Sequence, residues 1–405
     1  MKKKYWLWIG SAFHAVLLIV LTLFALSIPD TLEDDVMLVQ FTSIFRKFIL
    51  KDTQKPDRDR FLFVNIAWDK EFIPKYDEDS FQVGMQTITD RKKLGQFVKI
   101  LNDYPHHKIA LLDIFFSDTS ANDSLLKVEL AKSKKCLISY HKDKTDKAIY
   151  PIFKANYSLS DMESDRPMIL KYKLVQGDSL KTTPLIMYEN VYKACYHKGL
   201  LFDWLDDKPI LNAFILDYRI RAYNILKENE YNIVYLGELL KLPPEFIAEL
   251  TKDRIVLVGD YEDRDLHRTV YGIMSGTLIL LNAFLALEAG DNQISIGLIL
   301  FLFVGFWIAS AKAFMVRDPV TRFIEKKLGS EHFMVELFLD TTFFLVYMVV
   351  MSLTSYFLFN IHIGVLFLSF YLYAIELIAT FVLEWKEKKV QKTLLEDENK
   401  TEENS

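Results

Sequence analysis

The chain has 405 residues, of which 51% are hydrophobic, 14% aromatic and 25% charged, and its formal net charge is −5 at pH 7. This mixture is typical of very apolar segments beside an ordinary soluble domain. The modest charge, without a long basic run in the soluble part, excludes nucleic acid as an expected partner. The two cysteines, Cys136 and Cys195, lack the CxxC spacing of a zinc site, so they either form one disulfide or remain free thiols.

The first expected element is a transmembrane helix over residues 5–28, within an N-terminal anchor of residues 1–28. The run is almost entirely apolar and exceeds the ~20 residues that cross a bilayer. A cleaved signal peptide is the alternative, since Ala25-Leu26-Ser27 resembles a cleavage site. A signal peptide has an apolar core of only ~7–15 residues, so the length of this run favours an uncleaved anchor.

Residues 29–292 have the pattern of a soluble α/β domain. A helix over residues 36–49 opens it, and three continuous apolar runs then alternate with helical segments. Asp90 is positioned to cap the first of these helices, and Asn122 or Asp123 the second. This alternation, with continuously apolar strands, predicts a mainly parallel sheet with flanking helices. The expected strands cover residues 61–69, 108–116 and 135–140.

The second half of this domain has a less regular pattern until its last strand. Residues 210–221 are expected to contain a strand, and residues 235–240 favour a helix. Residues 254–260 form a continuous apolar run that predicts the closing strand. A charged loop over 261–268 follows, and residues 276–288 are expected to form a helix.

Three further transmembrane helices are expected within residues 293–384, because each of three segments is long and apolar enough to cross a bilayer. Asn360 is the single polar residue between the last two, so they should form a tight hairpin. The polar tail over residues 385–405 is expected to be disordered. The expected spans cover residues 294–316, 335–359 and 361–383.

Lysine and arginine residues flank the four expected spans in a consistent way. The positive-inside rule places both termini in the cytoplasm and residues 29–292 outside, in a multi-pass protein of the inner (cytoplasmic) membrane. The turn at Asn360, on the outer side, carries no lysine or arginine. The flanking basic residues are Lys2, Lys3, Lys4, Arg317, Arg322, Lys326, Lys327, Lys386, Lys388, Lys389 and Lys392.

Several short motifs carry a resemblance to a known family. The most specific is Asp265-Leu266-His267-Arg268-Thr269, followed by Gly272, Gly276 and Asn282. The other matching residues are Asp69, Thr89-Asp90-Arg91, Asp113-Ile114-Phe115-Phe116-Ser117 and Ile255-Val256-Leu257-Val258-Gly259. Over roughly residues 30–384 the chain resembles the second type of CHASE domain, an extracellular sensory domain found ahead of bacterial cyclases and histidine kinases.

The chain departs from the pattern of that family at two motifs. It has Thr89-Asp90 where the family often has Trp-Pro, and Ser275-Gly276 where the family often has Pro-Gly. The resemblance implies an extracytoplasmic sensor and an output domain after the last span. Because only a short tail follows Leu383, we expect a stand-alone member that signals through a separate protein.

Six polar side chains near the ends of the expected strands are candidate ligand-binding residues. Carboxylate and imidazole groups that converge above a parallel sheet could bind a cation or a small polar ligand. The alternative is that the aspartates cap helices and accept hydrogen bonds from loop amides. The sequence leaves open whether a metal binds. The candidates are Asp69, Asp113, Asp118, Asp260, Asp265 and His267.

Three charged residues, Lys312, Asp340 and Glu376, lie near or within different expected spans. Charges at that depth are costly and usually pair with one another. They either form a cluster that fixes helix packing, or only Glu376 is buried while Lys312 extends to the membrane surface and Asp340 begins its helix near the headgroups.

The sequence contains no HExxH, phosphate loop, GxGxxG or serine elbow, so no enzymatic activity and no cofactor are expected. It favours an integral-membrane sensor whose outer domain detects a ligand or partner and transmits through the membrane helices to a separate output protein. The alternative is a non-catalytic membrane subunit or scaffold of a transport or envelope-assembly complex. The expected partners are the lipid bilayer, a separate protein and, if the chain homo-oligomerises, further copies of itself.

Overall fold

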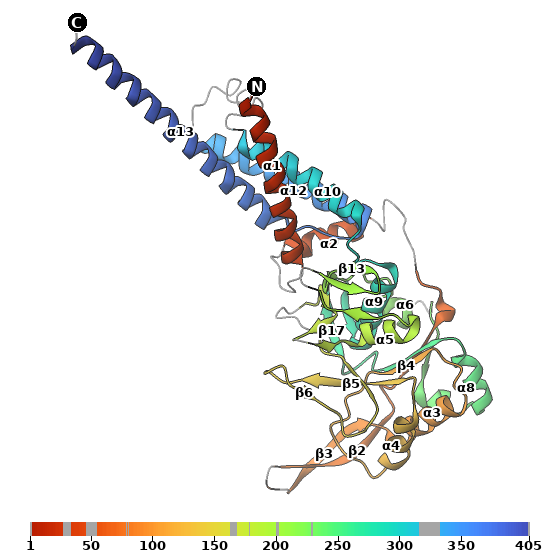
Figure 1. Cartoon of the computed structure of the whole chain (residues 1–405). Coiled ribbons are helices and arrows are strands. Elements are labelled where there is room, and N and C mark those ends of the chain that lie inside the picture. Colours follow the sequence, from red (N-terminus) through yellow and green to blue (C-terminus); the bar gives the residue numbers. More distant parts are fainter. Residues whose placement is uncertain are drawn as a thin grey trace. The chain divides into compact units, whose positions relative to one another are not determined.

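The computed structural model of the chain divides into two compact units (Figure 1). One unit contains residues 1–42 and 294–405, and the other contains residues 43–293. The residues that the structure describes are 2–26, 34–45, 55–77, 79, 81–162, 168–177, 179–199, 202–227, 230–315 and 333–403.

The larger unit is built on a central sheet, in which seven strands lie within the described residues. Their order is β15-β1-β16-β4-β5-β6, with β7 also paired to β5. Every pairing is parallel except that of β5 with β6. The prediction of a mainly parallel sheet is therefore confirmed. The strands are β1 (Phe61–Asn65), β4 (Ile109–Leu112), β5 (Cys136–Lys142), β6 (Ala148–Ile149), β7 (Asn156–Leu159), β15 (Ile233–Tyr235) and β16 (Ile255–Gly259).

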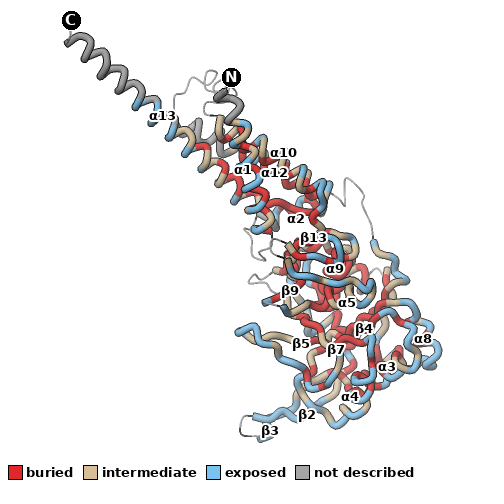
Figure 2. Tube along the Cα trace, in the orientation of Figure 1, coloured by how far each residue is buried: buried red, intermediate tan, exposed pale blue. Residues whose placement is uncertain are grey.

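Alternate residues of β1, β4, β5 and β16 enter two separate hydrophobic cores, one on each face of the sheet. On β1, Phe61 and Phe63 pack on one face, while Leu62 and Val64 pack on the other. Fully burying a side chain of this size stabilises the fold by about 2 kcal/mol. Figure 2 shows the resulting buried residues along the central strands. Because both faces of β1, β4, β5 and β16 are buried, these four strands are largely apolar, which is why the sequence predicted them.

Helices cover both faces of the sheet, as the sequence predicts. The core on the Phe61 face includes residues of α5 (Thr183–Tyr192) and α9 (Gly276–Ala289). The core on the Leu62 face includes residues of four other helices. These are α3 (Arg91–Asp103), α4 (Asp123–Lys132), α7 (Leu236–Leu239) and α8 (Pro244–Thr251). The helix α9 is buried along its length from Gly276 to Leu287.

The predicted helix caps hold at one position and not at the other. The Asp90 carboxylate accepts a hydrogen bond from the backbone N–H of Lys93 at 2.9 Å, which caps α3. At α4, Asn122 occupies the cap position without a capping hydrogen bond from its side chain. The Asp123 carboxylate instead accepts a hydrogen bond from the N–H of Ser120 at 2.8 Å and so tightens the preceding turn.

Two hairpins are present where the sequence did not predict strands. The segment after β1 forms β2 (Lys70–Tyr76) paired with β3 (Gln82–Thr89). The charged loop expected over 261–268 instead leads into β17 (Leu266–Thr269), which pairs with β18 (Gly272–Ser275). Both pairs are exposed over most of their length, so they lack the continuous apolar pattern that marks the central strands.

Residues 210–221 contain a strand, as expected, but it is short. The chain forms β13 (Lys208–Ile210) and β14 (Ala213–Ile215), and then leaves the strand conformation. Beyond that point the backbone of Ile220 exchanges hydrogen bonds with the Asn282 side chain of α9, which substitutes for strand pairing. The remaining short elements are a 3-10 turn over Arg58–Arg60, β8 (Lys171–Lys173), β9 (Val175–Gln176), β10 (Leu180–Lys181), β11 (Tyr196–His197), β12 (Asp203–Leu205) and α6 (Ala222–Leu226).

Both cysteines are free thiols. Cys136 is buried in β5 and Cys195 is exposed. The structure therefore favours the second of the two alternatives that the sequence left open.

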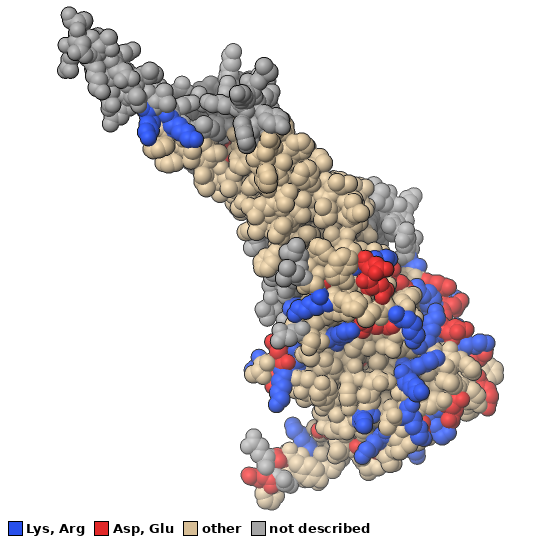
Figure 3. Space-filling model, in the orientation of Figure 1, with Lys and Arg blue, Asp and Glu red and all other residues tan. Residues whose placement is uncertain are grey.

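The smaller unit consists of helices, four of which are long and apolar enough to cross a membrane. Their apolar segments have mean hydropathies from 1.9 to 2.3. Figure 3 shows the contrast between the charged surface of the larger unit and the largely uncharged described surface of these helices. They indicate a membrane protein. The helices are α1 (Lys2–Leu26), α2 (Asp34–Phe45), α10 (Ile296–Phe314), α12 (Phe333–Phe359) and α13 (Val365–Glu403).

The ends of these helices agree with the sequence at one point and differ at another. Asn360 adopts the left-handed conformation, with φ of 59°, and separates α12 from α13 as expected. The tail expected to be disordered instead continues α13 as far as Glu403. Its glutamate, lysine, glutamine and leucine residues have high helix propensity, which the compositional argument for disorder did not weigh. The helix expected over 36–49 is described only as α2, because residues 46–50 lie outside the described residues.

Candidate functional site

A cavity of about 470 Å³ opens in the larger unit beside the carboxyl ends of β4 and β5 and the first residue of α9. Its volume falls within the range of small-molecule sites, about 300–1,000 Å³. The wall is mixed in character, with three carboxylates, two imidazoles and one guanidinium beside apolar side chains. The lining residues are Asp113, Phe115, His141, Ser160, Asp161, Met162, Ile169, Asp265, His267, Arg268 and Gly276.

Asp113 follows the last residue of β4, so its carboxylate lies at the edge of the sheet. Its Oδ1 accepts a hydrogen bond from Ser139 Oγ at 2.8 Å, and its Oδ2 accepts one from Thr277 Oγ1 at 2.9 Å. Burial, with the nearby charge of Asp265 as a second cause, raises the pKa of Asp113 to about 6. The carboxylate therefore joins β4 and β5 to the first turn of α9.

Asp265 and His267 lie on the hairpin side of the cavity. Asp265 Oδ1 lies 2.9 Å from His267 Nε2. This hydrogen bond, with the negative charge behind it, raises the pKa of His267 above its usual value. The backbone oxygen of Asp265 also accepts a hydrogen bond from the N–H of Gly276 at 2.9 Å. The pair is thus joined to the start of α9.

A second acid–imidazole pair, Asp161 and His141, forms another part of the wall. Asp161 Oδ1 lies 2.6 Å from His141 Nδ1, and Oδ2 accepts a hydrogen bond from the N–H of Lys142 at 2.5 Å. The hydrogen bond to Asp161 raises the pKa of His141. The His141 ring also meets the Phe115 ring edge to face, with centroids 4.7 Å apart. These contacts fix the orientation of the imidazole at the cavity.

Arg268 lies beside these pairs on β17. Its backbone is held in the hairpin opposite Ile273, and its carbonyl accepts a hydrogen bond from the N–H of Ile169 at 2.9 Å. Its side chain is exposed and lines the cavity. Within the part of the chain that the structure describes, the guanidinium has no ion-pair partner.

Comparison with known families decides which one this architecture represents. Residues 15–311 match the family model of the CHASE2 domain. The chain belongs to the CHASE2 family. The match begins within α1 and ends within α10, so it includes the whole larger unit, which we call the CHASE2 domain. No curated protein and no solved structure matches the chain.

Three of the six predicted site residues lie at the cavity of the CHASE2 domain, and three lie elsewhere. Asp113, Asp265 and His267 line the cavity. Binding of a ligand by these three stays a prediction. Asp69, Asp118 and Asp260 are not among the lining residues, and each has other partners.

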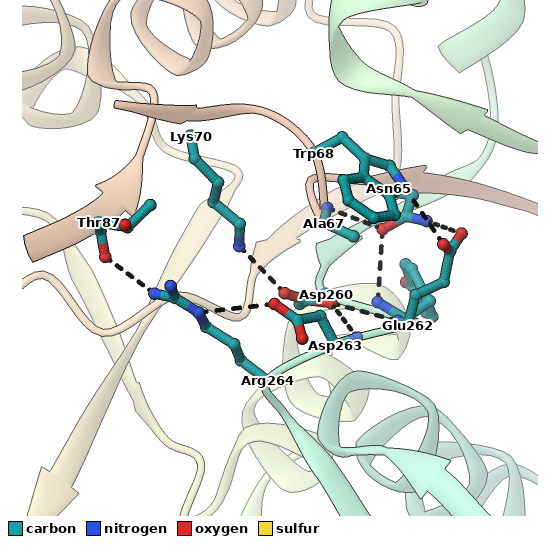
Figure 4. A network of polar contacts seen from close by, with 10 residues as sticks. Asn65, Ala67, Trp68, Lys70, Thr87, Asp260, Glu262, Asp263 and Arg264 are labelled. Atoms are coloured by element: carbon teal, nitrogen blue, oxygen red, sulfur yellow. Dashed lines mark hydrogen bonds and ion pairs between the residues drawn. The ribbon is translucent and has the colours of Figure 1, made fainter. Parts of the chain in front are cut away.

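Asp260 belongs to a separate polar network (Figure 4). Its carboxylate lies 3.0 Å from Lys70 Nζ and accepts hydrogen bonds from the backbone N–H groups of Glu262 and Asp263 at 3.2 and 2.9 Å. The loop amides, with Lys70, lower the pKa of Asp260 despite its burial. Asp260 therefore satisfies a loop, as in the alternative that the sequence left open.

Asp69 and Asp118 have comparable local roles. Asp69 lies 2.6 Å from Lys93 Nζ and accepts a hydrogen bond from the N–H of Gly237 at 3.0 Å. Asp118 accepts hydrogen bonds from Gln86 at 2.9 Å and from Ser117 at 2.5 Å. In each case these contacts join neighbouring segments of the domain.

The sequence did not identify His141, Ser160, Asp161 and Arg268 as site residues. His141 directly follows the predicted strand over 135–140, so its position at a strand end was an available signal. Asp161 follows β7, a strand that the sequence did not reveal, and reaches the cavity because β7 pairs with β5. Arg268 belongs to the motif that carried the family resemblance.

The arrangement does not resemble a metal centre. Among the described residues, no group of three or more histidine, cysteine, aspartate or glutamate side chains is placed to hold a metal ion. Instead, each imidazole at the cavity is paired with one carboxylate. The polar wall is therefore better suited to ion pairs and hydrogen bonds with an organic ligand than to coordination of a cation.

Gly259, at the end of β16, lets Thr277 of α9 lie close enough to the sheet to donate its hydrogen bond to Asp113. A Cβ at this position would lie 2.0 Å from Thr277 Oγ1 and 3.0 Å from Thr277 Cβ. Gly259→Ala should therefore destabilise the CHASE2 domain by about 2 kcal/mol, because α9 must move away from the sheet. Urea unfolding followed by circular dichroism measures the effect. Gly84→Ala is the matched control, since its Cβ would meet no atom within 4 Å. Equal stabilities of the two variants would contradict this account.

In the smaller unit, which we call the membrane unit, the structure brings together two of the three charged residues that the sequence singled out. Lys312 Nζ on α10 lies 2.8 Å from Glu376 Oε1 on α13, and both side chains are only 10% exposed. The side chain of Asp340 lies outside the described residues. Lys312 therefore contacts another helix here, rather than only extending along its own helix to the membrane surface.

A further polar contact joins three helices of the same unit. His14 on α1 lies 2.8 Å from Ser310 on α10 and 3.2 Å from Tyr371 on α13. Ser310 lies two residues before Lys312, and Tyr371 lies five residues before Glu376. The α10–α13 interface is thus held by polar contacts at two levels.

Proposed function

We propose that this chain is a membrane sensor whose CHASE2 domain binds a small polar ligand in the cavity and transmits binding through the membrane helices to a separate protein. The observation that carries the proposal is the position of α9. Its first residue, Gly276, lines the cavity, and its last residue is followed after a short turn by α10. One helix therefore begins at the cavity and leads in sequence to a predicted span.

The first turn of α9 is the proposed point of coupling. The carboxylate of Asp113 accepts a hydrogen bond from Thr277, and the backbone oxygen of Asp265 accepts one from Gly276. A ligand that contacts either aspartate changes the charge or geometry opposite this turn. A ligand favours one conformation only to the extent that it binds that conformation more tightly. The hydrogen bonds of Asp113 and Asp265 to the first turn of α9 provide a structural basis for a difference in ligand affinity between two conformations of that turn.

The other end of α9 suits transmission to the membrane. Gly290 ends the helix in the left-handed conformation, with φ of 74°, and donates a backbone hydrogen bond to Leu287. Ser295 then caps α10 by accepting a hydrogen bond from the N–H of Leu298 at 3.1 Å. Only residues 290–295 separate the two helices in sequence, so little slack is available to absorb a displacement of α9.

The proposed orientation places residues 29–292 outside the cytoplasmic membrane and both termini in the cytoplasm. The lysine and arginine residues that flank the spans support this topology. The cavity then faces the exterior, and the output is delivered inside. We propose a sensory rather than an enzymatic role, with a membrane-associated or cytoplasmic protein as the partner.

Hydrogen exchange on the full-length protein in a mild detergent tests this function. A panel of polar metabolites is first screened by thermal unfolding. The compound with the largest shift should then change exchange in the first turn of α9, because the ligand acts on its hydrogen bonds. The double variant Asp265→Ala/His267→Ala should lose the shift. Asp118→Ala, at an acid outside the cavity, should keep it. Retention of the shift in the double variant would sink the proposal.

A second candidate is a non-catalytic subunit or scaffold of an envelope complex. The β2–β3 hairpin favours it, since Phe72 and Phe81 are each more than 70% exposed and Met85 is 55% exposed. Exposed aromatic and methionine side chains are enriched at protein interfaces. In this alternative the hairpin, rather than the cavity, is the functional surface.

A further inference from the structure

The charged side chains around the cavity are not all paired with one another within the described residues. Asp265 and Asp161 each lie within 3 Å of an imidazole, at 2.9 Å and 2.6 Å respectively. Each of these acids also raises the pKa of its histidine, so each pair favours the ionised form. Two of the three carboxylates therefore already have an imidazole neighbour at hydrogen-bond distance.

Asp113 is the carboxylate without such a neighbour. Its hydrogen bonds come from the neutral hydroxyl groups of Ser139 and Thr277. No lysine, arginine or histidine of the described chain lies within ion-pair distance of it. A buried carboxylate is costly unless a cation or several donors compensate it. The raised pKa of Asp113 is a consequence of that cost. A cationic group in the cavity would remove it.

Arg268 is the complementary case. Its guanidinium has no ion-pair partner among the described residues, while its backbone is fixed by the β17–β18 pairing. Guanidinium recognises carboxylate with two parallel hydrogen bonds. A negatively charged group in the cavity would supply its partner.

We propose, on the basis of the proposed sensory function, that the ligand is a small zwitterion whose ammonium group faces Asp113 and whose carboxylate faces Arg268. A purely anionic ligand meets three carboxylates, and a purely cationic ligand leaves Arg268 without a partner. A zwitterion supplies a positive partner for Asp113 and a negative partner for Arg268. The volume of about 470 Å³ and the apolar contacts of Phe115, Met162 and Ile169 leave room for a short apolar side chain.

Matched derivatives of one probe separate the two charges. L-Valine is titrated into the full-length protein in detergent micelles by calorimetry, together with glycine, L-alanine and β-alanine. The tightest of these is then compared with its methyl ester, which lacks the carboxylate, and with its N-acetyl derivative, which lacks the ammonium group. The zwitterion should bind about tenfold or more tightly than either derivative, because each derivative loses one charge-assisted hydrogen-bonding group.

Two substitutions assign the charges to their residues. Arg268→Gln should weaken binding of the zwitterion about tenfold and leave binding of its methyl ester unchanged. Asp113→Asn should weaken binding of the zwitterion and the methyl ester, and leave binding of the N-acetyl derivative unchanged. Each variant should thus spare the derivative that lacks the charge it contacts, whereas a general loss of structure would weaken binding of every derivative. Arg264→Gln, four residues before Arg268 and outside the cavity lining, is the matched control and should bind as the unaltered chain does.

The outcomes separate this inference from the function on which it rests. If the methyl ester or the N-acetyl derivative binds as tightly as the zwitterion, the zwitterion assignment is overturned and the sensory function stands. If none of the four zwitterions binds, the assignment is also overturned, and the metabolite panel with exchange at α9 decides the sensory function. If only a zwitterion binds, and the two substitutions act as described, the inference is confirmed.

Discussion

Asp113→Asn should raise the free energy of unfolding of the CHASE2 domain by about 3 kcal/mol at about pH 7.5. The folded chain holds a proton on Asp113 more tightly than the unfolded chain does, because burial and Asp265 raise the pKa from 3.8 to about 6. Folding above that pKa therefore requires an ionised carboxylate in an unfavourable environment. Asparagine has nearly the same shape and carries no charge.

The sign of the pH dependence follows from the same shift. The unaltered domain should lose stability as the pH rises from about 4 through about 6, since the folded state binds more protons in that window. His141 and His267 act in the same direction. Their raised pKa values give stability that is present below 6.5 and is lost as the pH rises through the folded pKa. Because Asp113 is protonated in the folded state near pH 4, the stability difference between Asp113→Asn and the unaltered domain should disappear there.

A pH series of urea unfolding, followed by tryptophan fluorescence, measures the effect. Asp207→Asn removes one negative charge at an exposed turn and is the matched control, expected to change stability by less than about 0.5 kcal/mol. An Asp113→Asn variant that is less stable than the unaltered domain at about pH 7.5 would show that the hydrogen bonds to Ser139 and Thr277 outweigh the cost of the charge. The expected stabilisation by Asp113→Asn is typical of functional sites, where a charged group is kept at a cost in stability.

Glu376→Gln and Lys312→Met should each destabilise the membrane unit by about 3 kcal/mol. Each substitution removes the counter-charge that lies 2.8 Å away, at a position where both side chains are only 10% exposed. The double variant should be less destabilised than the sum of the single variants, because neither charge then remains. Thermal unfolding in detergent, followed by helical ellipticity, gives the four values of the cycle.

The exposed pair of Lys99 and Asp103 is the matched control for that cycle. Its atoms lie 2.6 Å apart, but its side chains are 52% and 51% exposed. Exposed pairs contribute only about 0.5 kcal/mol, so the coupling there should be small. Additive effects at Lys312 and Glu376 would mean that the intramembrane contact does not hold α10 to α13, and the polar-cluster hypothesis would fail.

The parts of the fold that the sequence predicted are those whose causes are local. Strands buried on both faces give continuous apolar runs, and Asp90 caps α3 from the adjoining position. The same causes make the four apolar helices evident. The β2–β3 and β17–β18 hairpins were missed because their exposed strands give no such run. Their pairing depends on cross-strand contacts, which a single sequence does not display.

The site was harder to predict, because most of it depends on pairing over long distances. Asp161 reaches the cavity only because β7 lies beside β5. Asp69 and Asp260 were predicted at the site, yet each forms an ion pair with a lysine elsewhere in the chain, Lys93 and Lys70 respectively. Position at a strand end was therefore a sound criterion for Asp113. For Asp69 and Asp260, position at a strand end did not show that a lysine pairs with each carboxylate away from the cavity.

The complete burial of α9 has a consequence for the form that any signal takes. From Gly276 to Leu287 the helix has no solvent-facing side. At its middle, the Asn282 side chain accepts a hydrogen bond from the N–H of Ile220 and donates one to the carbonyl of Ile220. Bending or rolling such a helix would open voids along its whole length, whereas a slide of the rod along its axis keeps most neighbours in place. A push at Thr277 would then arrive undiminished at Ala289, about 20 Å away. We therefore expect α9 to move along its axis, if it moves, rather than to bend.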